Sequence, residues 1–65
     1  MKKKELKQIA QRIAAAELTL RTTDDSWKRQ CAQDEILELT GRVDDIEDML
    51  ALDEMIQKIL EKNLT

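Results

Sequence analysis

The first third of the chain carries a regular stripe of apolar positions. Its apolar side chains recur at spacings of 3, 4, 3 and 4 residues, at Leu6, Ile9, Ile13, Ala16 and Leu20. This is the spacing of the seam along which two helices pack. Ala10 and Ala14 widen the stripe and would let a partner helix approach closely. The pattern predicts a helix over about residues 2–21.

A run of short polar residues follows at positions 22–26. Thr22 or Thr23 can accept hydrogen bonds from the free N–H groups of a new helix, and Asp24 and Asp25 would then favour its positive end. A short turn here would fold the second helix back against the first. We therefore predict an antiparallel helical hairpin.

The rest of the chain allows two interpretations, which differ at Gly41. In one, a single long helix covers about residues 24–62 and tolerates the glycine at a cost of about 1 kcal/mol. In the other, Thr40 and Gly41 end a helix of residues 24–40, and a third helix begins near Asp44. We prefer the long helix, whose overhang beyond the first helix would need another chain to cover it.

The apolar positions of this second half do not keep one face. At about 100° per residue, one face holds Ile36, Leu39, Val43, Ile46 and Leu50. Seven other large apolar or thiol side chains lie well away from it, namely Trp27, Cys31, Met49, Leu52, Ile56, Ile59 and Leu60. Either the helix is interrupted, or different lengths of it face different partners.

Composition fixes the class as all-α. Proline is absent, Gly41 is the only glycine and Trp27 the only aromatic residue, so the turn chemistry of a β-protein is missing. The 65 residues form one small domain, residues 1–65, whose core alone gives little net stability. A lone Cys31 and the absence of histidine exclude an internal disulfide and a closed zinc site. We therefore expect the hairpin to assemble into a homo-oligomeric helical bundle.

The expected core and interface are made of the apolar residues that follow the helical pattern, with Trp27 as the strongest single anchor of a contact. They are Leu6, Ile9, Ile13, Leu20, Trp27, Cys31, Leu39, Val43, Ile46, Leu50, Ile56 and Leu60.

The net charge of −3 is unevenly distributed. Residues 1–33 carry eight Lys or Arg against four acids, whereas residues 34–54 carry nine acids against Arg42 alone. The two parts can attract one another within a chain or between chains. A possible nucleic-acid patch consists of Lys2, Lys3, Lys4, Lys7 and Arg12. The acidic balance and the distance of the only aromatic residue from this patch favour a solvated helix end instead.

Paired acids are the only candidate for catalytic chemistry. Glu35 and Glu38 form an E-x-x-E pair. Two similar pairs follow, Asp44 with Glu47 and Asp45 with Asp48. They resemble the magnesium-binding helices of all-α nucleotide pyrophosphohydrolases of the MazG type. The gap between the pairs is shorter than in that family, and no E-x-x-D follows at the family's spacing. With no histidine base and no glycine-rich loop, we predict no enzyme, no cofactor and no metal site.

The stretch from Glu38 to Gln57 reads ELTGRVDDIEDMLALDEMIQ. It resembles the C-terminal half of small helical proteins of Gram-positive phages and prophages, which share the pattern L-[TS]-G-x-[IV]-x-x-[IL]-E-D-M-[LM]-x-[IL]-D-E-x-[IV]-Q. The resemblance covers about a third of the chain and implies a phage or prophage origin, with no activity to transfer. In size and helicity the chain is also similar to Rop-type hairpins, whose dimer is an RNA-binding four-helix bundle.

The sequence predicts a water-soluble, cytoplasmic protein. No run approaches the roughly 20 apolar residues of a membrane span, and polar residues from Glu5 onward interrupt any signal-peptide core. Our first hypothesis is a non-enzymatic interaction or regulatory protein that works as a homo-oligomer with a host or phage protein as partner. The second is a Rop-like nucleic-acid-binding bundle. The third is a metal-dependent nucleotide pyrophosphohydrolase.

Overall fold

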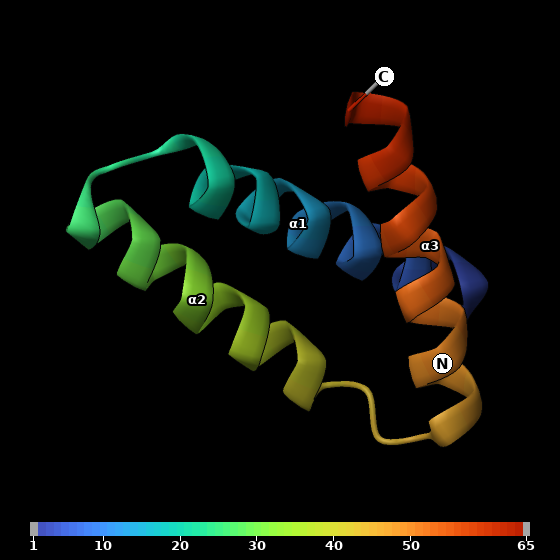
Figure 1. Cartoon of the computed structure of the whole chain (residues 1–65). Helices are drawn as coiled ribbons and strands as arrows, with labels where there is room; N and C mark the ends of the chain where they lie inside the picture. Colours follow the sequence, from blue (N-terminus) through green and yellow to red (C-terminus); the bar gives the residue numbers. More distant parts are fainter. Residues whose placement is uncertain (1, 65) are drawn as a thin grey trace.

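The computed structural model describes residues 2–64, which form three helices (Figure 1). They are α1 (Lys3–Thr22), α2 (Ser26–Gly41) and α3 (Ile46–Leu64). The all-α class is confirmed. The preferred single helix over residues 24–62 is wrong, because the chain leaves helical conformation after Gly41 and starts a new helix at Ile46.

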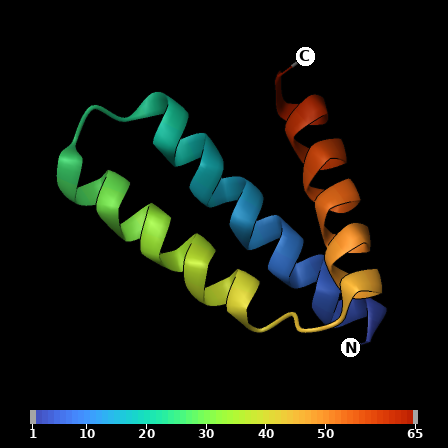
Figure 2. The same cartoon turned by 60° about the horizontal axis from the view of Figure 1, so that its bottom comes forward.

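Helix α1 is the centre of the fold. It packs along α2 on one side and against α3 on the other, whereas α2 and α3 make only minor contact with each other. The two views show α2 running antiparallel to α1, and α3 crossing the N-terminal half of α1 (Figures 1 and 2). The molecule is correspondingly thin, with principal extents of 34, 27 and 16 Å. The two outer helices are therefore each covered mainly by α1.

The first break is built by side chains at the start of α2. The Asp25 carboxylate accepts the Trp27 backbone N–H at 3.0 Å, and the Thr23 hydroxyl oxygen accepts the Asp25 N–H at 3.2 Å. The break lies where the sequence predicted it, but the capping residue is Asp25 and neither of the predicted threonines. The Thr22 hydroxyl instead donates to the Leu18 carbonyl at 2.8 Å, within the last turn of α1.

Arg29 links the two arms of this hairpin. Its guanidinium Nη1 donates to the Leu20 carbonyl oxygen at 3.1 Å. Carbonyl groups in the last turn of a helix have no partner within the helix and carry its partial negative charge. Arg29 therefore satisfies an otherwise free acceptor of α1 from the second turn of α2.

The second break confirms the other interpretation, because α2 ends at Gly41 and a third helix begins at Ile46, two residues after the expected Asp44. Gly41 does not have a positive φ, and the residue after it, Arg42, is still near helical conformation at φ −79° and ψ −15°. The Arg42 N–H donates to Leu39 O at 3.2 Å, and the Val43 N–H donates to Thr40 O at 3.1 Å. In the last turn of α2 the backbone hydrogen bonds therefore join residues three apart, as in a 3₁₀-helix, and the helix then ends.

Helix α3 starts with a side-chain cap. The Asp45 carboxylate accepts the Glu47 N–H at 3.0 Å, which satisfies one of the free donors of the first turn. Val43 is 4% exposed and anchors the connecting segment in the core. The connection between α2 and α3 is therefore residues 42–45, with a buried Val43 and a capping Asp45.

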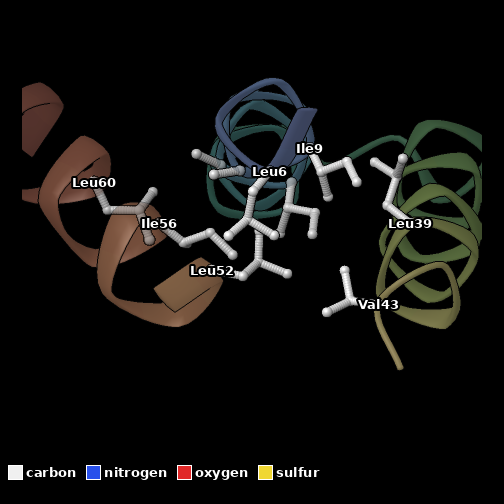
Figure 3. Close-up of a cluster of buried hydrophobic side chains, with 10 residues drawn as sticks. Leu6, Ile9, Leu39, Val43, Leu52, Ile56 and Leu60 are labelled. Atoms are coloured by element: carbon white, nitrogen blue, oxygen red, sulfur yellow. The ribbon is translucent and has the colours of Figure 1, made fainter. Parts of the chain in front are cut away.

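One apolar cluster holds the three helices together. It consists of Leu6, Ile9, Ala10, Ile13, Ala14, Leu39, Val43, Leu52, Ile56 and Leu60. Figure 3 shows Leu52 and Ile56 of α3 directed toward Leu6, with Leu39 and Val43 on the opposite side near Ile9. Ile13 is the largest side chain that is fully buried.

Two alanines let the helices approach α1 closely. Ala10 and Ala14 are completely buried, and Ala16 is 5% exposed. A methyl side chain at these positions leaves room for a neighbouring backbone, which a larger residue would push away. Over residues 2–64, the structure contains no helix with the length and apolar content that a membrane crossing requires.

Candidate interaction surfaces

The chain exposes more surface than a compact monomer of its size. Its accessible area is 5094 Å², whereas a folded monomer of 7.6 kDa is expected to expose about 4,300 Å². The excess over this average is about 800 Å². It follows from the arrangement, because α2 and α3 cover α1 but scarcely cover each other.

The most exposed apolar cluster lies at the start of α3, and we call it the α3 tip: Ile46, Met49 and Leu50. Their exposed fractions are 73%, 43% and 68%. Ile46 and Leu50 lie one turn apart and share a face of the helix. The sequence placed Ile46 and Leu50 on one stripe with Val43, but the break before Ile46 ends that stripe and turns both side chains to the surface.

Acidic residues surround the α3 tip. Residues 43–57 contain six carboxylates and no Lys or Arg. Asp44, Asp45 and Glu47 precede or flank Ile46, and all three are exposed. No group of three or more acidic or thiol side chains among residues 2–64 is arranged to hold a metal ion. The exposed acids form a negatively charged rim beside the apolar side chains of the α3 tip.

A groove with the opposite charge lies between α1 and α3, and we call it the lysine groove. It is lined by Lys3, Lys4, Lys7, Met55, Lys58 and Ile59. The half-buried side chains of Met55 and Ile59 form its apolar floor, and the four lysines surround it. Within residues 2–64, no carboxylate is ion-paired with the three lysines of α1, whereas the Lys58 Nζ lies 3.4 Å from Glu54 Oε1.

The lysine groove divides the basic patch suggested by the sequence. Lys3, Lys4 and Lys7 come together there, and Lys58, which the sequence analysis did not include, joins them from α3. Lys2 is exposed at the start of α1. Arg12 does not belong to the groove, because it lies between α1 and α2 beside Leu39 and Arg42.

Trp27 and Cys31 lie on the surface between α1 and α2. Trp27 is 73% exposed, and Cys31, one turn later, is also exposed. Both line a shallow groove with Arg12 and Glu35. Neither residue belongs to the core of the single chain, so their assignment to an interface stays a prediction.

Most of the other residues that the sequence analysis assigned to the core or interface are buried in the single chain. The structure buries Leu6, Ile9, Ile13, Leu39, Val43, Ile56 and Leu60. Leu20 is half-buried. Leu52 is 2% exposed and was missing from the sequence-based set, although it lies one turn before Ile56. Leu37, which was also missing, is 72% exposed on α2.

Comparison of the chain with protein-family models, with curated proteins and with solved structures finds no match. The function is therefore inferred from the surfaces themselves: the α3 tip, the lysine groove and the Trp27 face.

Proposed function

We propose that this protein is a non-enzymatic helical interaction protein that works as a homo-oligomer. The observation that carries the proposal is the apolar α3 tip, where Ile46 and Leu50 are 73% and 68% exposed. Exposed apolar residues that form a group surrounded by polar residues are typical of protein contact sites. A second copy of the chain is the simplest partner, because it is present wherever the protein is and at the protein's own concentration.

The size of the apolar contribution supports a contact of moderate strength. Burying one Ile or Leu side chain stabilises an association by about 1.5–3 kcal/mol. Ile46 and Leu50, each exposed by about two thirds or more, would together provide roughly 2–4 kcal/mol on this scale. A micromolar complex needs about 8 kcal/mol, so the two residues serve as anchors within a larger contact.

The proposed origin, location and further partner of the protein come from the sequence. The resemblance of residues 38–57 to small phage and prophage proteins supports a phage or prophage origin and a phage or host protein as a further partner. The lone Cys31 fits a reducing compartment and so supports a cytoplasmic location. Within the proposed oligomer, the exposed Trp27 face remains free for that second protein.

Sedimentation velocity and light scattering from micromolar to millimolar concentration test the proposal. We expect an average mass above 7.6 kDa that rises with concentration. The Ile46→Ser/Leu50→Ser double variant should associate more weakly, with the same helix content by circular dichroism because both side chains are exposed. A single species of 7.6 kDa over the whole concentration range would overturn the proposal.

Nucleic-acid binding is a second candidate, and the gathering of Lys3, Lys4, Lys7 and Lys58 favours it. Four phosphate contacts predict a fall in affinity with a log–log salt slope of about −3 to −4. The net charge of −3 and the position of Trp27 in a different groove weigh against it. An electrophoretic shift of structured RNA at low salt, lost in the Lys4→Glu/Lys7→Glu variant, is the expected result for this candidate. The absence of any shift at low salt would exclude it.

A further inference from the structure

We propose that the α3 tip of one copy docks in the lysine groove of the next copy, so that the chains join head to tail. This inference rests on the proposed function, because it names which surfaces make the contact between copies. It is carried by three observations: the match of charge and apolarity, the placement of the two surfaces on opposite sides of α3, and the exposure of the apolar side chains of the tip.

The two surfaces are complementary in chemistry. The groove offers an apolar floor of Met55 and Ile59 within a ring of four lysines. The tip offers the apolar side chains of Ile46 and Leu50 within a segment of six carboxylates and no cation. Lysine side chains can lay their aliphatic stems along apolar residues and direct their ammonium groups toward carboxylates at the rim. Opposite charge around an apolar centre guides association and fixes its orientation.

An acidic partner would stabilise the lysines of the groove by compensating their charge. Lys3, Lys4 and Lys7 lie in the first two turns of α1, where the backbone already carries partial positive charge. No carboxylate among residues 2–64 is ion-paired with them. An acidic segment brought into the groove compensates the positive charge of these three lysines, for which the described part of the chain supplies no ion-paired carboxylate.

The same copy cannot fill its own groove. On a helix with about 100° per residue, the face of Ile46 and Leu50 lies about half a turn from the face of Met55 and Ile59. The two pairs are also separated along α3 by about 14 Å, at 1.5 Å per residue. Since α3 is one continuous helix, its tip cannot turn back into the groove that its opposite face lines.

This placement also determines the symmetry of the assembly. In a two-fold dimer the same patch is used on both copies and faces the other copy. A tip and a groove on opposite faces of one helix cannot both point at a single neighbour. Each copy therefore uses its groove with one neighbour and its tip with another, which gives an open chain or a ring.

The small apolar area of the two surfaces indicates a weak joint. A contact centred on two apolar side chains of the tip and two of the groove is smaller than a standard interface of about 1,600 Å². This lies at the lower end of specific contacts, where association is transient. We therefore expect dissociation constants in the micromolar range or weaker and a strong dependence on salt.

Two variants that each block one side of the joint provide the test. The groove-blocked variant is Lys4→Glu/Lys7→Glu. It reverses exposed charges near the start of α1, where acids are favourable, so folding is retained. The tip-blocked variant is Ile46→Ser/Leu50→Ser, which removes exposed apolar side chains only. Leu37→Ser and Lys28→Glu are the matched controls, because both residues are exposed and lie outside the two surfaces.

We expect the wild-type mass to rise with concentration beyond that of a dimer, and each blocked variant to associate at least about tenfold more weakly. A 1:1 mixture of the two blocked variants keeps one intact groove and one intact tip. It should form a heterodimer of twice 7.6 kDa that does not grow further. The two controls should behave as the wild type, and raising the salt concentration should weaken wild-type association by about tenfold.

The outcomes separate the two proposals. If the wild type oligomerises but either blocked variant does so equally well, the joint is wrong and the proposed function stands. The same holds if the mixture stays monomeric, or if the wild type stops at a closed dimer. If the wild type remains a monomer at millimolar concentration, both proposals fail. The salt dependence of the wild type tests the joint without any variant.

Discussion

Truncation of Ile13 to alanine tests whether α1 is the centre of the fold. Ile13 is 2% exposed and lies midway along α1, within the cluster that joins all three helices. The change removes three carbon groups, each worth about 0.8 kcal/mol when buried, or about 2.4 kcal/mol together. The cavity left behind adds to this, so we expect a loss of about 2.5–4 kcal/mol. A domain of 65 residues has about 3–10 kcal/mol in total.

Urea and thermal unfolding followed by circular dichroism measure the effect, at a concentration where wild type and variant are both monomeric. At about 4–8 °C per kcal/mol for a domain of this size, the Tm of Ile13→Ala should fall by at least about 10 °C. Leu37→Ala is the matched control. Its side chain is 72% exposed, and its loss should change the free energy of unfolding by less than about 0.5 kcal/mol. If the two variants unfold at the same midpoint, Ile13 is not in the core and the packing around α1 is refuted.

Substitutions at two positions and one labelling experiment probe the two ends of α2 and its surface beside α1. Gly41→Ala should raise the free energy of unfolding by up to about 1 kcal/mol. The reason is that φ is not positive there and nothing lies within 4 Å of an added Cβ. A lower free energy of unfolding in the same urea titration would contradict the helical end at Gly41. Asp25→Ala should lower the free energy of unfolding by about 1 kcal/mol, because the side-chain acceptor for the Trp27 N–H is lost. Asp25→Asn keeps a side-chain oxygen that can accept this hydrogen bond, so it should retain most of the stability. Cys31 is exposed and should react with a thiol reagent within a few-fold of the rate in urea; protection of more than about tenfold in the monomer would show that the side chain is covered.

The first helix and the first break could be predicted because their signals are local and strong. The 3-4 spacing of Leu6, Ile9 and Ile13 describes the buried face of α1 closely. The capping residue could not be chosen, because every residue from position 22 to 26 has a side-chain oxygen that can cap a helix. The choice of Asp25 follows from where the chain must turn to place α2 against α1.

The second break was present in the sequence as a drift of apolar positions and as Gly41, but these signals did not outweigh the preference for one long helix. The structure ends α2 at Gly41 and Arg42 without a positive φ, and it starts α3 at an Asp45 cap. A four-residue connection resets the helical phase, so Ile46 and Leu50 cannot be placed by counting from Val43. Counting backward from Ile56 and Leu60 at one-turn spacing would have identified the buried Leu52.

The candidate surfaces depend more on tertiary structure. Lys7 and Arg12 are five residues apart, or about 140° around a helix, so their separation into two grooves could be anticipated from the sequence. The addition of Lys58 could not, because it depends on how α3 crosses α1. A position on a helix surface predicts neighbours on the same helix, and only the crossing of two helices brings Lys58 to Lys3.

The central place of α1 has a consequence for how the molecule comes together during synthesis. Helix α1 leaves the ribosome first, but the helix that covers its other side, α3, is made last. Until Leu60 has emerged, part of the apolar face of α1 has no cover from its own chain. The hairpin of α1 and α2 is then an incomplete intermediate, and the final turns of α3 complete the cooperative unit.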